Sequence, residues 1–74
     1  MNYEEIREEL IIKYATYSIL SSRAYDLVLK STWNTPRYHK AYRLAEYFRG
    51  QERALSYCLD TINLRIKAQR EGTL

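Results

Sequence analysis

The sequence has little cysteine, histidine, proline or glycine: 74 residues include one Cys, one His, one Pro and two Gly. A single cysteine excludes an internal disulfide, and one Cys with one His cannot complete a tetrahedral zinc site. No apolar run approaches the roughly 20 residues that span a bilayer. The chain does not start with a basic segment and an apolar run, so it shows no secretory signal. We therefore expect a cytoplasmic protein with no membrane contact, metal or cofactor.

Residues that could perform catalysis are equally scarce. His39 and Cys58 are 19 positions apart on one predicted helix, which separates them by roughly 28 Å. Cys58 follows Leu55-Ser-Tyr, and we expect it to be a small buried side chain. There is no glycine-rich phosphate loop. The sequence therefore predicts no catalytic residue and no enzymatic activity.

What the chain does contain is a regular spacing of apolar residues over positions 3 to 30. These residues recur every three or four positions, as on one side of a helix: Tyr3, Ile6, Leu10, Tyr14, Tyr17, Leu20, Ala24 and Leu27. Asn2 and Glu5 have the spacing of a helix N-terminal capping box. We predict a first helix over about residues 3–30.

A second helix is predicted over about residues 36–70. Pro36 suits the first helical position, Thr35 or Asn34 is the expected N-cap, and Gly72 follows the end. Apolar residues again share one side, interrupted by Glu52, in a heptad-like spacing: Ala41, Ala45, Phe48, Leu55, Leu59, Ile62 and Ile66.

The fold class is therefore all-α. Two long helices joined by a turn at about residues 31–35 form an antiparallel hairpin, a single domain over residues 1–74. A chain this short rarely buries enough apolar surface on its own. Several apolar residues also lie outside the first helix's main stripe: Ile11, Ile12, Ile19, Tyr25, Val28 and Leu29. We expect a homo-oligomer, either a four-helix bundle or a larger helical assembly.

The back of the second helix is the predicted oligomer interface. It carries small and apolar residues nearly opposite the heptad-like side: Gly50, Ala54, Tyr57, Thr61 and Leu64. Gly50 weakens a helix by about 1 kcal/mol relative to Ala. Three interpretations remain open: close approach of another backbone, a kink or break in the helix, or a tolerated surface glycine.

The segment 31–43 contains the only Trp, Pro and His of the chain. We interpret it first as the turn, with Trp33 covering the end of the bundle and His39 in contact with water. Tyr and Arg dominate many protein interfaces, so the same region is also a candidate contact surface for a partner. Its candidate residues are Arg37, Tyr38, Lys40, Tyr42, Arg43 and Tyr47.

These patterns favour a small non-enzymatic binding protein, an adaptor or inhibitor that acts through protein–protein contacts. Small tyrosine-rich, glycine-poor helical proteins are familiar from phages and mobile elements, and this chain has 8 Tyr. The alternative is an RNA- or DNA-binding regulator built from a dimer of hairpins. Residues 34–74 hold eight Lys/Arg against four Asp/Glu, whereas residues 1–33 hold four against five, and a basic half favours an anionic partner.

Overall fold

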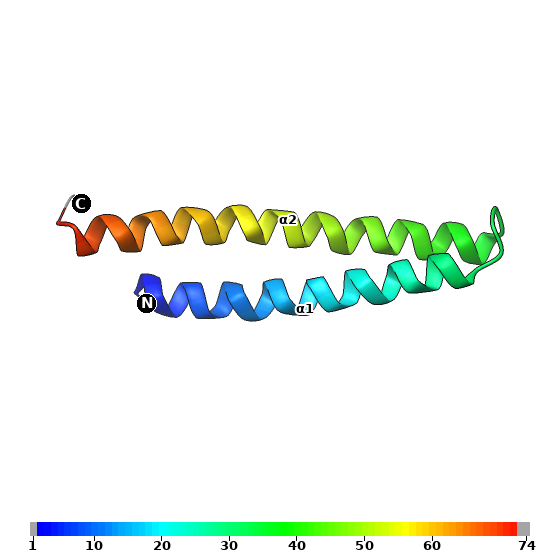
Figure 1. Ribbon diagram of the computed structural model, residues 1–74, viewed down its shortest axis with the longest axis horizontal. Helices are drawn as coiled ribbons and strands as arrows, with labels where there is room; N and C mark the ends of the chain where they lie inside the picture. The colour runs from blue at the N-terminus through cyan, green and yellow to red at the C-terminus, as the bar shows by residue number, and fades with distance from the viewer. Residues whose placement is uncertain (1, 73–74) are drawn as a thin grey trace.

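The computed structural model describes residues 2–72 as two antiparallel helices, α1 (Tyr3–Lys30) and α2 (Pro36–Arg70). They lie side by side along nearly their whole length, and both ends of the chain are at the same end of the rod (Figure 1). The molecule measures 56 × 15 × 15 Å. The all-α hairpin and both pairs of helix bounds are confirmed. Neither helix, over the described residues, is long and apolar enough to cross a membrane.

Each helix begins at a side chain that caps its first turn. The Oδ1 atom of Asn2 accepts a hydrogen bond from the amide of Glu5 at 2.9 Å. The Oγ1 atom of Thr35 accepts one from the amide of Tyr38 at 3.2 Å, with Pro36 at the first helical position. Thr35, and not Asn34, is thus the N-cap of α2. At the other end of α2, Gly72 has φ +69°, a conformation that favours glycine.

The turn between the helices is held by short-range hydrogen bonds. Asn34 has φ +61°, which asparagine tolerates better than most residues. Its Oδ1 atom lies 2.8 Å from Nε2 of His39, one turn into α2. Trp33 is 76% exposed in the single hairpin, and its covering the end of a bundle stays a prediction. Two helices side by side offer too narrow an apolar end for an indole ring to cover.

The core of the hairpin consists mostly of small side chains. Among the described residues, the buried ones are Ser21, Ala24, Ala41, Ala45 and Ile66. Serine and alanine at four of these five positions let the helices approach closely. The other members of the heptad-like side of α2 are half-buried beside this core: Phe48, Leu55, Leu59 and Ile62. Burial therefore follows the predicted side of α2, but no large side chain is fully enclosed.

Three details of the sequence interpretation change. Cys58 is exposed, so the prediction of a buried thiol was wrong; its position, about 100° round α2 from Leu59, places it at the edge of the contact with α1, near Ile6 and Leu10. Ser21 is buried although it is polar, while Leu27 of the predicted apolar side is 45% exposed. α2 also continues unbroken through Gly50, which excludes a break there.

Candidate protein-interaction surface

One polar cluster joins the two helices in the half of the rod nearer the turn. The hydroxyl of Tyr25 on α1 donates a hydrogen bond to Oε1 of Glu46 on α2. The same hydroxyl oxygen accepts a hydrogen bond from a guanidinium nitrogen of Arg49 at 3.4 Å. This hydrogen bond, more than the nearby carboxylates, raises the pKa of Arg49 above its ordinary value. The cluster is exposed and leaves Arg49 a cation, so it connects the helices without forming a reactive site.

No group of three or more His, Cys, Asp or Glu residues gathers closely enough to hold a metal ion in the described part of the chain. His39 is engaged with Asn34, and Cys58 lies further along α2. The side chains that stand out are instead exposed aromatic and basic residues near the turn.

A shallow depression of about 680 Å³ lies on α2 next to the turn. It is lined by Pro36, His39, Lys40, Arg43, Leu44 and Tyr47. These residues share one side of α2 because they recur at intervals of three or four. Two cations thus flank a floor made of Pro36, Leu44 and the Tyr47 ring. Such a floor can accept an apolar side chain, and the cations can pair with a neighbouring carboxylate.

An aromatic cluster lies beside this depression. The rings of Tyr38 and Tyr42 are nearly parallel, with centroids 6.3 Å apart. The ring of His39 meets Tyr38 edge-on at 5.4 Å. Tyr38 is half-buried, whereas Tyr42 is 45% exposed. Packing of the rings against one another restricts their rotamers, which lowers the entropy lost when they contact a partner.

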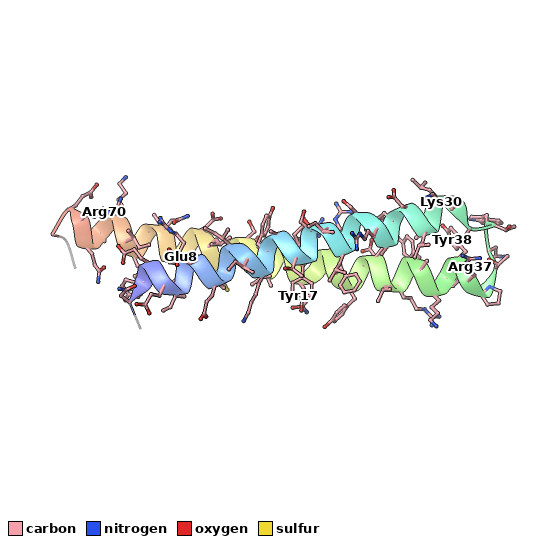
Figure 2. All side chains as sticks on the ribbon, turned by 90° about the horizontal axis from the view of Figure 1, so that it is seen from below. Glu8, Tyr17, Lys30, Arg37, Tyr38 and Arg70 are labelled. Carbon is pink, nitrogen blue, oxygen red and sulfur yellow. The ribbon has the colours of Figure 1, made fainter. Side chains whose placement is uncertain are left out.

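The structure therefore divides the predicted contact residues into two groups. Lys40, Arg43 and Tyr47 line the depression, while Tyr38 and Tyr42 belong to the aromatic cluster. Arg37 is exposed near the turn (Figure 2). We call the depression, the aromatic cluster, Arg37 and Trp33 together the turn-end surface.

Sequence reasoning did not include Trp33, Pro36, His39 or Leu44 in this surface. Trp33 and Pro36 were interpreted as parts of the turn and helix start. Leu44 could have been found, because it follows Lys40 by four positions and precedes Tyr47 by three.

The predicted oligomer interface lies elsewhere on α2, and every one of its residues is exposed in the single chain: Gly50, Ala54, Tyr57, Thr61 and Leu64. A Cβ atom built on Gly50 meets nothing within 4 Å. No backbone of the same chain thus requires glycine at this position. Close approach of a second chain at Gly50 stays a prediction.

Comparison of the chain with family models, curated proteins and solved structures finds no match to any of the three.

Proposed function

We propose that this chain is a small non-enzymatic binding protein that contacts another protein through the turn-end surface. The observation that carries the proposal is the exposure of Trp33, 76% of whose surface faces solvent at the tip of a rigid hairpin. An exposed indole costs free energy in water and supplies a large apolar contact when a partner covers it.

The neighbours of Trp33 support the same proposal. Tyr42 and Tyr47 are 45% and 57% exposed, and Arg43 lies between them in the depression. Trp, Tyr and Arg are the residue types that contribute most to binding free energy at protein interfaces. The preferred partner surface has an apolar side chain for the depression and a carboxylate for Lys40 or Arg43.

The test compares two double variants in capture experiments from a lysate of the source cells. Trp33→Ala with Arg43→Ala changes the turn-end surface. Leu64→Ala with Arg53→Ala removes an exposed apolar side chain and an arginine far from the turn, and Leu64 is 68% exposed. We expect one or more proteins to be retained by the wild type and by the second variant, and lost with the first. If both variants retain the same proteins as the wild type, the turn-end surface is not the binding site.

RNA or DNA binding is the alternative, favoured by the exposed cations beside exposed aromatic rings. Arg37, Lys40 and Arg43 could neutralise phosphates while Trp33 and Tyr42 stack on bases. The test uses a fluorescent single strand and a duplex at 50 and 200 mM salt. Nucleic-acid binding predicts an affinity that falls by at least tenfold over this range. Absence of binding to either probe at 50 mM would exclude it.

A further inference from the structure

One side of the hairpin carries an apolar groove between the two helices. Toward the turn, a groove of about 650 Å³ is lined by Lys13, Thr16, Tyr17 and Leu20 of α1 and by Tyr47, Phe48, Gln51 and Leu55 of α2. Further from the turn, one of about 400 Å³ is lined by Ile6, Leu10, Tyr57, Cys58, Thr61 and Ile62. The two follow each other along the rod, because Leu55 precedes Cys58 by three positions and Ile62 by seven.

The α2 residues along this side form a heptad-like series that overlaps the one that packs on α1: it shares Phe48, Leu55 and Ile62 with that series and adds Leu44, Gln51 and Cys58. Their spacing is 4, 3, 4, 3 and 4: Leu44, Phe48, Gln51, Leu55, Cys58 and Ile62. On α1, Ile12 and Ile19 flank Thr16 at four and three positions, and they are 67% and 54% exposed. We call this side, the two grooves with Leu44, Ile12 and Ile19, the groove face. Together the two overlapping series widen the apolar side of α2, which is the pattern of a helix that packs against two neighbours.

The single chain exposes more surface than a compact protein of its mass. Its accessible surface is 5865 Å², whereas a compact monomer of 8.9 kDa exposes about 4,800 Å². The excess, about 1,000 Å², is comparable with the roughly 800 Å² that each partner buries in a standard protein interface. A partner that covers the groove face would thus bring the chain close to the surface expected for a compact protein.

Charges at the two ends of the groove face are different. At the turn end, the helical positions that continue this side carry four cations and one anion: Arg23, Asp26, Lys30, Arg37 and Lys40. At the other end, Glu5 and Glu9 continue the α1 side, and Arg65 lies on α2. Figure 2 shows Lys30 and Arg37 near the turn and Glu8 toward the opposite end.

We infer that the groove face is covered by the groove face of a second copy of this chain, in antiparallel orientation. A parallel pair would place the excess of cations at one turn end against the same excess at the other. The antiparallel pair places each turn end against the opposite end of the other copy, so that Glu5 and Glu9 of one α1 lie opposite Arg23 and Lys30 of the other α1. A two-fold axis makes both contacts twice, and the two hairpins become a four-helix bundle.

The groove face lies about 90° round α2 from the predicted oligomer interface that contains Gly50. Tyr57 and Thr61 of the predicted interface line the groove, whereas Gly50, Ala54 and Leu64 do not. Lys40, Leu44 and Tyr47 lie on the border between the groove face and the turn-end surface. The rest of the turn-end surface, including Trp33 and Tyr42, stays exposed at each end of the dimer.

The experiment measures the mass of the purified chain by sedimentation equilibrium at 1–100 µM. We expect a particle of twice 8.9 kDa for the wild type. Thr16→Glu should raise the dissociation constant at least tenfold, because Thr16 lines the groove and the change places a carboxylate in the contact. Ala15→Glu is the matched control: Ala15 is the preceding residue, is exposed, and points about 100° away. Both positions are outside the hairpin core, and circular dichroism verifies that helix is retained.

The orientation has a separate test by charge exchange. Arg23→Glu with Lys30→Glu should weaken the dimer about tenfold, and adding Glu5→Lys with Glu9→Lys should restore it to within threefold of the wild type. A parallel dimer would show no such rescue, which would overturn the antiparallel arrangement.

Two results would overturn the interface itself. One is a wild-type chain that stays monomeric at 100 µM. The other is a dimer that persists with Thr16→Glu and dissociates with Gly50→Leu, since that places the contact on the back of α2. These measurements use the purified chain alone, so they are independent of whether a second protein binds the turn-end surface.

Discussion

The hydroxyl of Tyr25 links the two helices by donating to Oε1 of Glu46 and accepting from Arg49. Glu46 and Arg49 are 21 and 24 positions from Tyr25 along the chain, so the contact depends on the register of the hairpin. Because most buried side chains of the hairpin are small, this exposed polar contact can contribute to fixing the register.

Tyr25→Phe should therefore lower the free energy of unfolding by about 1 kcal/mol. The change removes the hydroxyl and both of its hydrogen bonds while keeping the ring. Urea unfolding followed by circular dichroism measures the effect, with Tyr57→Phe as the control because Tyr57 is 76% exposed. Equal stability of the two variants would show that the two hydrogen bonds of Tyr25 make no net contribution to the free energy of unfolding.

Ala45→Leu should destabilise the hairpin by about 1–3 kcal/mol. Ala45 has no exposed surface, and a leucine there would force the helices apart. The matched change Ala54→Leu is nine positions away on the same helix, at an exposed position, and should alter the unfolding free energy by less than about 0.5 kcal/mol. A thermal melt of both variants at one protein concentration distinguishes them. If the Ala45→Leu hairpin is as stable as the wild type, the helices are not tightly packed around Ala45.

Gly50→Ala should stabilise α2 by about 0.5–1 kcal/mol. The added Cβ meets no atom within 4 Å, and alanine loses less backbone entropy on folding than glycine. Gly72→Ala provides the contrast, since Gly72 has φ +69° and alanine is strained there. Chemical denaturation of both should give changes of opposite sign. Loss of stability in Gly50→Ala would instead indicate that another backbone approaches Gly50.

Thr35→Ala should cost about 1 kcal/mol, because it removes the acceptor for the amide of Tyr38. Thr35→Ser keeps an oxygen at the same position and should retain most of the stability. Hydrogen exchange of the amides in the first turn of α2 gives a local measurement. Faster exchange in Thr35→Ala alone is the expected result, and equal exchange in both variants would argue against the cap.

The local elements of this fold followed from the sequence. The interval of three or four between apolar residues specified both helices, and Asn2, Pro36 and Gly72 specified their ends through hydrogen bonding and backbone preference. These are interactions between residues near one another in the chain, so they are present in the sequence pattern. The antiparallel hairpin followed from them, since five residues between two long helices leave no other compact arrangement.

Only the tertiary structure decided which apolar residues the partner helix covers. The rotation of each helix about its axis buries Ser21 and leaves Leu27 and Cys58 exposed. Ala24, Ala41 and Ala45 are the residues that this rotation buries in the part of the contact nearer the turn. A regular stripe does not specify this rotation to within one residue. The same rotation brings the apolar residues of α1 and α2 together along one side and leaves the exposed indole of Trp33 at the turn. The second copy and the partner proposed here each depend on a surface that the packing of the two helices creates.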